Sequence, residues 1–307
     1  MVHQVVREIV PTYKELCIFF FGDEQDGSPG YKAEYWQEFE HQFRRHKNAR
    51  AIGLGDYGDW LRPSMRARLQ SSMAKDAGSR KAMDKLVLKD HDKIIDKHEF
   101  LKGKLLGLHE GHHTWELASG GNLDQRLAAA LGASFLGWTA STRLVLVQQR
   151  VRQISRLGIP GGYVYTIVST HGNANGRKVG SAANWLESNI VEGFTADQYV
   201  MGHGCKNASF VPHARDIVRR VGQAGLDRTI PRCLIVGGFS EGYTNGWDYS
   251  YVEKAGYAPQ PPGWGELRLK LVQRKPEDLA RGVVTKRAHI ALHVEQVNVT
   301  PGGQNES

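Results

Sequence analysis

Short apolar segments alternate with longer polar stretches along this chain, and none of the apolar segments is long enough to span a bilayer. The longest runs from Leu16 to Phe21, which is the length of one buried strand. Aromatic side chains then recur at helical spacing within Tyr35–His46, and a second apolar run covers Ala51–Gly55. The chain is therefore expected to open with a β-α-β arrangement.

The remainder of the sequence continues the alternation of strands and helices. Pro63 opens a polar stretch that ends near Lys102, and its apolar spacing predicts helices that cover one rim of the domain. A further helix is expected over 124–131. Further strands are expected over 104–109, 143–147, 163–168, 198–201, 232–236, 267–271 and 289–297. We therefore expect an α/β fold with one domain over residues 1–299, a helical insertion at about 63–102 and a disordered tail over 300–307.

Composition narrows the class of protein without identifying its function. The 307 residues have a mean hydropathy of −0.44, and the N-terminus lacks the apolar core of a signal peptide. Three cysteines are too few for a disulfide framework and favour a reducing, cytoplasmic location. The net charge of +8 gives a mild preference for a polyanionic partner. However, the basic residues are spread out, and a solvated surface explains them equally well.

Aspartate, histidine and glutamine side chains recur where an apolar run gives way to a loop. Any one of them has an ordinary explanation, because an aspartate after a strand is more often a turn former or a helix cap. Their joint occurrence at five successive strand ends indicates a metal site assembled from distant parts of the chain. The five segments are Gly22-Asp23-Glu24-Gln25, Gly55-Asp56-Tyr57-Gly58-Asp59, Gly111-His112-His113, His171-Gly172 and Gly202-His203-Gly204-Cys205.

In order and spacing these segments resemble the motifs of the calcineurin-like metallophosphoesterases, which read D-x-H, G-D-x-x-D, G-N-H-[DE], H-G and G-H-x-H. The resemblance covers roughly residues 16–206, and the region around 243–263 also looks like the tails of phage-encoded members. It implies a four-layer α/β/β/α sandwich of two mixed β-sheets flanked by helices. It also implies a dinuclear metal enzyme that hydrolyses phosphomonoesters or phosphodiesters with a metal-activated hydroxide.

The resemblance also assigns roles to individual residues. Asp56 would be the carboxylate that bridges two cations. His113 would stand beside the phosphate as general acid, with its imidazole oriented by Asp59. The remaining ligands divide between the cations, with Asp23, Gln25 and Cys205 on the first and His112, His171 and His203 on the second.

Three of these positions depart from the family pattern. Gln25 and Cys205 stand where the family has histidines, so the first cation is expected to be held more weakly than the second. His112 replaces the family's asparagine and adds an imidazole to the second site. A Cys205 thiolate would favour zinc or iron over manganese, and the identity and number of the metals stay open.

Two alternatives remain open from the sequence. Gly107-Leu108-His109-Glu110 offers another register for the third motif, but Leu108 cannot ligate a metal, so His109 is expected to be a core or supporting residue. The departures also allow a catalytically degenerate scaffold that binds a partner or nucleic acid without hydrolysis, and such a scaffold would lack metal. An enzyme would act on a phosphoester, with nucleotides and nucleic acids both within range, and no membrane partner is expected.

Overall fold

Strand β2 (Glu15–Phe21) shows how the layers of the molecule are built. Its even-numbered side chains, from Leu16 to Phe20, belong to an apolar cluster that fills the space between two sheets. Its odd-numbered side chains, from Cys17 to Phe21, belong to a second cluster, where they pack against helix α1 (Ala33–Arg45). A strand buried on both faces requires a continuous apolar sequence, which this segment has.

The first sheet contains β2 and has the strand order β14-β13-β2-β3-β4-β5. The pairs from β2 to β5 are parallel, whereas β13 and β14 add antiparallel strands beyond β2, so the sheet is mixed. The bounds of the other strands are β3 Ala49–Gly53, β4 Leu105–His109, β5 Phe135–Gly137, β13 Trp264–Gln273 and β14 Ile290–Val299.

The second sheet has the order β1-β6-β7-β8-β12-β9 and is also mixed, because β6 and β9 run antiparallel to β7 and β12. Strands β10 and β11 form a separate antiparallel pair. The bounds are β1 Val2–Val10, β6 Thr139–Gln148, β7 Tyr163–Thr170, β8 Gln198–Met201, β9 Ala208–Phe210, β10 Arg215–Ile217, β11 Asp227–Thr229 and β12 Arg232–Ile235.

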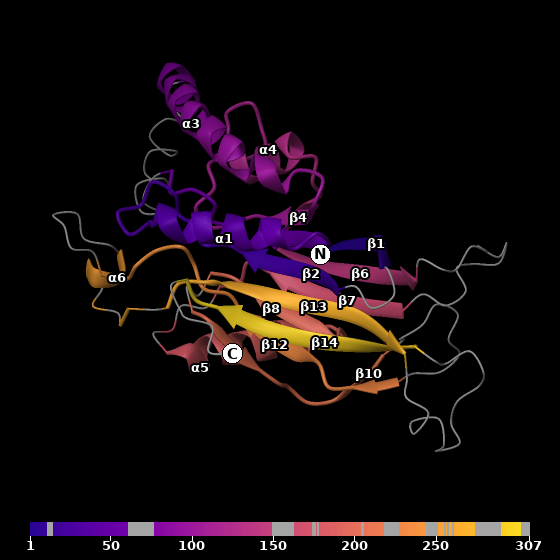
Figure 1. Cartoon of the computed structure of the whole chain (residues 1–307). Coiled ribbons are helices and arrows are strands. Elements are labelled where there is room, and N and C mark those ends of the chain that lie inside the picture. The colour runs from indigo at the N-terminus through magenta and orange to yellow at the C-terminus, as the bar shows by residue number, and fades with distance from the viewer. Residues whose placement is uncertain are drawn as a thin grey trace, which may run out of the picture.

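Helices cover the outer faces of both sheets (Figure 1). Helices α1, α3 (Ala77–His98) and α4 (Leu123–Ala130) lie on the side of the first sheet, and α5 (Val179–Leu186) packs on the second. Short turns complete the set, namely a 3-10 turn over Glu99–Leu101, a π-helical turn over Glu187–Val191 and α6 over Tyr251–Lys254. The layers therefore run α/β/β/α, and the fold class expected from the sequence is confirmed.

The computed structural model describes residues 1–10, 15–60, 77–148, 163–173, 176, 178–203, 206–217, 227–243, 251–254, 256, 258–259, 261–273 and 290–301. The expected strands and helices that fall on these residues are present, with ends shifted by a few positions. Of the expected insertion, residues 77–98 form α3, while 61–76 are not described, so its full extent stays a prediction. The expected disorder of the tail also stays a prediction.

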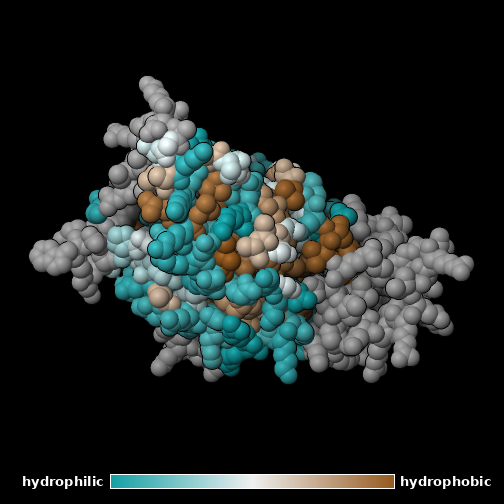
Figure 2. Space-filling view, turned by 90° about the horizontal axis from the view of Figure 1, so that it is seen from above, coloured by the Kyte–Doolittle hydropathy of each residue, from teal (hydrophilic) through white to brown (hydrophobic). Residues whose placement is uncertain are grey.

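No helix in the described part of the chain has the length and hydrophobicity needed to cross a bilayer. The face seen from above carries hydrophilic residues with smaller groups of hydrophobic ones between them (Figure 2).

Candidate metal centre

Asp56 and three histidines form a compact group at one edge of the sandwich. Each offers one ligand atom, and these atoms all lie within 4.8 Å of one another; the histidines are His112, His171 and His203. The four residues follow strands β3, β4, β7 and β8, respectively, within three positions of the strand end. Because β3 and β4 belong to one sheet and β7 and β8 to the other, strand ends from both sheets deliver the group.

His171 is oriented for metal binding by a backbone carbonyl. Its ring is buried, and Nδ1 donates a hydrogen bond of 2.6 Å to the carbonyl oxygen of Leu54. This bond leaves the lone pair of the neutral imidazole on Nε2. That Nε2 atom lies 2.9 Å from Nδ1 of His112 and 3.5 Å from Oδ2 of Asp56. Potential ligand atoms from three segments of the chain therefore face the same space.

The rings of the other two histidines complete the group. The ring centroid of His203 lies 4.2 Å from that of His112 and 5.0 Å from that of His171. Trp138 lies beside them, with its centroid 4.8 Å from that of His112. The carbonyl oxygen of Trp138 accepts hydrogen bonds from His171 N at 3.1 Å and from Thr170 Oγ1 at 2.9 Å. The segment between β5 and β6 therefore fixes the position of His171.

The electrostatics of the group favour cation binding. Burial disfavours the charged form of Asp56, but the imidazoles of His171 and His113 and the backbone N–H of His113 hold the pKa of its carboxyl below the ordinary value. Burial lowers the pKa of His171, and it lowers the pKa of His203 to about 3 with a contribution from the neighbouring histidines. At neutral pH His171 and His203 are therefore uncharged, and a cation need not displace a proton from either ring.

Backbone strain is concentrated at the predicted ligands. Within the described part of the chain, the non-glycine residues with positive φ are Asp23, Gln25, Asp56 and His203, with φ between 49° and 58°. The left-handed conformation costs an L-residue roughly 1–2 kcal/mol. Strain of this kind persists only where the surrounding structure enforces it, and it clusters at functional sites. The four positions were all selected as ligands from the sequence alone.

The two acidic loops are joined by backbone hydrogen bonds. Asp23 N donates to the carbonyl oxygen of Gly55 at 3.0 Å, and Gln25 N donates to that of Asp56 at 2.9 Å. Gly55 has φ +98°, and a Cβ atom there would lie 2.8 Å from His171 Nδ1. A side chain at this position would therefore displace the ligand ring, so the close approach of the loops requires glycine.

The residues assigned to the first cation are less completely assembled. Asp23 is buried on the neighbouring loop, but its carboxylate does not join the four-residue group. Gln25 is half-buried, and its backbone contact with Asp56 places it next to the group. Cys205 lies outside the described residues. The first site therefore stays a prediction, whereas Asp56 and the three histidines assigned to the second cation lie together.

His113 lies beside the group and contacts two carboxylates. Its backbone N–H donates to Oδ1 of Asp56 at 2.7 Å, and its Nδ1 donates to Oδ1 of Asp59 at 3.1 Å. Its Nε2 atom lies 3.9 Å from Oδ2 of Asp56. The hydrogen bond to Asp59 therefore leaves Nε2 on the side of the metal ligands, which is where a general acid would be needed.

The loop around Glu24 is held by contacts that the sequence does not indicate. This side chain, between Asp23 and Gln25, is fully buried and accepts hydrogen bonds from His98 Nε2 at 2.7 Å and from Lys97 Nζ at 2.6 Å. Burial opposes its ionisation, yet the two partners hold the pKa of Glu24 below the ordinary value. The last turn of α3 thus anchors the first acidic loop. Lys97 and His98 are more than 70 residues away in the chain, so no local pattern indicates this contact.

Replacing Lys97 with methionine is expected to destabilise the protein and to weaken the first metal site. Lys97 also donates to Oδ2 of Asp26 at 2.9 Å, so the substitution leaves two carboxylates without this cation. Removing one member of a buried ion pair costs about 3–5 kcal/mol, and losing a supporting contact lowers metal affinity about 10- to 100-fold. Urea unfolding and a metal titration would measure the two effects.

Lys93→Met provides a matched control for this prediction. Lys93 lies one turn earlier on α3 and pairs with Asp90 on the exposed surface at 2.8 Å. Its loss is expected to change neither stability nor metal affinity appreciably. Equal effects of the two substitutions would show that Lys97 does not anchor the loop.

A second buried carboxyl group supports the loop that carries His112 and His113. Oδ2 of Asp124 accepts a hydrogen bond of 2.9 Å from Gly111 N, and burial raises the pKa of Asp124 to about 8. Helix α4 presents this residue because a capping box between Asn122 and Gln125 fixes its first turn. The sequence placed Asp124 only within a helix and gave no sign of this contact.

His109 takes no part in the metal group. It is fully buried, its Nδ1 donates to the carbonyl oxygen of Gly137 at 2.8 Å, and its Nε2 lies 2.8 Å from Oγ of Ser169. Burial lowers the pKa of His109 to about 4. The geometry therefore agrees with the register that assigns the metal ligand to His112.

The buried neutral His109 is expected to make the protein less stable in mild acid. Its pKa is about 4 in the folded protein and 6.5 in the reference state, so between these values the unfolded chain binds a proton that the folded chain does not. This contribution to stability is complete above pH 6.5. It decreases by about 3 kcal/mol as the pH drops to 4. In chelator-treated protein, His109→Gln should reduce the pH dependence of the unfolding free energy over this range. His41→Gln, on the exposed surface, should leave that dependence unchanged.

Comparison with known proteins gives distant structural similarity only. No protein family model and no curated protein matches the sequence. Vps29 from Entamoeba histolytica, solved in complex with Zn2+, has 10% sequence identity and a TM-score of 0.37, with 92% of this chain and 99% of that chain covered. The calcineurin-like phosphoesterase YfkN from Bacillus subtilis has 12% identity and a TM-score of 0.32, with 92% and 90% covered. At these scores the similarities do not establish a shared function.

Proposed function

We propose that this protein is a divalent-metal-dependent phosphoesterase of the calcineurin-like type. The observation that carries the proposal is the convergence of Asp56, His112, His171 and His203 within 4.8 Å from four separate strand ends. Three imidazoles and one carboxylate form a donor set that suits zinc, iron or manganese. The uncharged ring of His171, with its Nε2 lone pair facing the group, fits such a cation.

The proposal extends to a second, weaker cation. Asp56 would bridge the two, and Asp23, Gln25 and Cys205 would complete the other shell. An amide oxygen is a poorer donor than the imidazole it replaces, so this position would be filled only at higher metal concentrations. The sequence departures at Gln25 and Cys205 fit a divergent branch of the family, such as its phage-encoded members.

The cation, when bound, would supply a hydroxide nucleophile at neutral pH and neutralise charge on the phosphoryl oxygens. The protein's own residues would handle the leaving group. In its imidazolium form, His113 would donate the Nε2 proton to the departing oxygen and be left as a neutral imidazole, while Asp59 accepts from Nδ1–H at 3.1 Å and prevents the ring from turning away. Asp56 fixes the backbone of His113 through its Oδ1 atom, so the proton donor and the metal ligands keep a constant separation.

Elemental analysis of the purified protein, followed by assays on chromogenic phosphate monoesters and diesters, would test the proposal. Bound zinc, iron or manganese, together with activity that a chelator removes and added metal restores, is the expected result. A protein that stays free of metal at millimolar concentrations and hydrolyses neither class of ester would contradict it. That outcome would favour the alternative of a degenerate scaffold, which retains the fold and binds partners without chemistry.

A further inference from the structure

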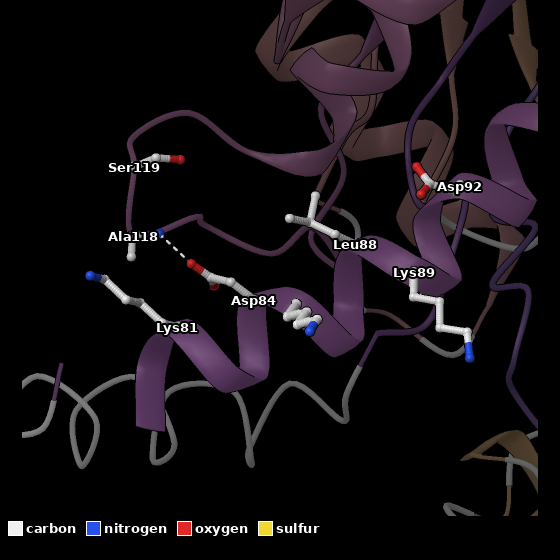
Figure 3. Close-up of a pocket in the computed structure, with 8 residues that line it drawn as sticks. Lys81, Asp84, Leu88, Lys89, Asp92, Ala118 and Ser119 are labelled. Atoms are coloured by element: carbon white, nitrogen blue, oxygen red, sulfur yellow. Dashed lines mark hydrogen bonds between the residues drawn. The ribbon is translucent and has the colours of Figure 1, made fainter. Parts of the chain in front are cut away.

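A groove on the helical side of the molecule has a distinctly basic lining. It measures about 560 Å³ and lies between α3 and the loop that follows the metal-binding histidines. Figure 3 shows Lys81, Asp84, Leu88 and Lys89 along the helical wall and Ala118 and Ser119 on the opposite wall. Lys85, one helical turn from both Lys81 and Lys89, completes the basic lining.

The three lysines form a row suited to a chain of negative charges. Lys81, Lys85 and Lys89 repeat every fourth residue and are exposed, with a rise of about 6 Å between successive members. None of the three has an ion-pair partner among the residues that the structure describes. Three ammonium groups therefore face solvent along one side of the groove.

The two acidic residues of the groove do not cancel this charge, because both are already engaged. Asp84 accepts hydrogen bonds from Trp115 Nε1 at 2.8 Å and from Ala118 N at 2.9 Å. Asp92 pairs with Arg126 at 2.6 Å. The lysines are thus the unengaged charges, and the contacts of Asp84 tie the two walls together.

Both walls of the groove belong to segments of the chain that continue to the proposed metal site. Ala118 is six residues after His112, so their Cα atoms are at most about 22 Å apart. On the other wall, α3 continues to Lys97, which contacts the first acidic loop. A substrate that occupies both places needs a length of a few phosphodiester units.

An exposed aromatic ring lies next to the same metal ligands. Trp138 is 43% exposed although its ring lies against that of His112. Its carbonyl oxygen accepts hydrogen bonds from His171 N and Thr170 Oγ1, so its backbone is fixed beside the metal-binding group. An exposed indole beside the proposed metal site is suited to stacking on an unpaired base.

We propose that the substrate of this site is a single-stranded nucleic acid, with its backbone along Lys81, Lys85 and Lys89 and a base stacked on Trp138. The proposal rests on the phosphoesterase function proposed above and names its substrate class. Lysines without base-reading partners would bind phosphates regardless of sequence, and stacking on tryptophan tolerates every base. Recognition would therefore depend on strandedness and length rather than on sequence.

Fluorescence anisotropy with labelled DNA and RNA 12-mers, measured on chelator-treated full-length protein over a range of salt concentrations, tests the proposal. The triple variant Lys81→Gln, Lys85→Gln, Lys89→Gln should bind at least 10-fold more weakly at low salt. The slope of log affinity against log salt should fall in magnitude by about 2 for the single strands, as three lost phosphate contacts require. Trp138→Ala should weaken binding about 5- to 100-fold with the slope unchanged, and Trp138→Phe should retain most of the affinity.

A second triple variant, Arg45→Gln, Lys47→Gln, Lys102→Gln, removes the same charge from exposed positions near the amino ends of β3 and β4, away from the metal ligands. It should bind like the wild type. Equal losses in the two triple variants would overturn the proposal in favour of a general polyanion surface. Equal binding of single strands, duplex and heparin, with no effect of Trp138→Ala, would overturn it in the same way.

The activity of the wild type on small chromogenic esters distinguishes a failure of the proposed substrate class from a failure of the proposed phosphoesterase function. Ester hydrolysis with no lysine-dependent binding refutes only the substrate class, whereas strand binding without metal or hydrolysis refutes only the phosphoesterase function.

Discussion

Asp56→Asn is expected to abolish hydrolysis and to strip metal from the protein. Asp56 is the only carboxylate in the four-residue group, and its Oδ2 atom lies 3.5 Å from Nε2 of His171. An amide keeps the volume and the hydrogen bond from His113 but removes the negative charge that neutralises a cation. A loss of about 4 kcal/mol in transition-state charge stabilisation alone corresponds to a rate loss of about 10³-fold, and the loss of the metal removes the remaining activity. Turnover and metal content, measured on the same sample, should fall together.

A readout independent of activity comes from thermal stability. Metal binding to the folded state raises the melting temperature of the wild type, and this increase should disappear in Asp56→Asn. Asp90→Asn, an identical substitution on the exposed face of α3, should behave as the wild type. Full metal occupancy with undiminished turnover in Asp56→Asn would show that the ligand assignment is wrong.

The parts of the fold that were predictable are those with strong local signals. Leu16–Phe21 is buried on both faces and therefore carries a continuous apolar run, and the aromatic spacing of α1 follows from packing on that strand. Strand β1 was not predicted, because its residues Val2 and Val5 are exposed and its ordering comes from pairing with β6. The partner strand begins more than 130 residues later, and pairing over that distance leaves no mark on the local sequence.

The candidate site likewise contains residues that the sequence indicates and residues that it does not. Aspartates and histidines after strand ends are visible in the sequence, and the fold brings four of them together. The residues that support them are not visible, because Lys97, Asp124 and Trp138 act through contacts that exist only once the layers are packed. Whether Gln25 and Cys205 hold a cation depends on side-chain positions that neither motif order nor spacing determines.

His113→Ala is expected to lower the hydrolysis rate about 10²- to 10⁴-fold while leaving metal content unchanged. His113 is not a member of the metal-binding group, and its Nε2 atom is left available because Nδ1 is bound to Asp59. Its side chain therefore contributes a proton donor rather than a ligand. The loss should be largest for esters with poor leaving groups, since an activated nitrophenolate departs without protonation.

Two comparisons isolate this role. His112→Ala, one residue earlier, removes a ring whose Nδ1 lies 2.9 Å from Nε2 of His171, so it should lose metal as well as activity. Asp59→Asn should keep the metal but weaken the orientation of His113, with a smaller rate loss than His113→Ala. If His113→Ala instead emerges free of metal, then His113 belongs to the coordination shell and the leaving oxygen must take its proton from another group. Equal losses on activated and unactivated esters, with metal retained, would likewise exclude the general-acid role, because only a proton donor is sensitive to the basicity of the leaving group.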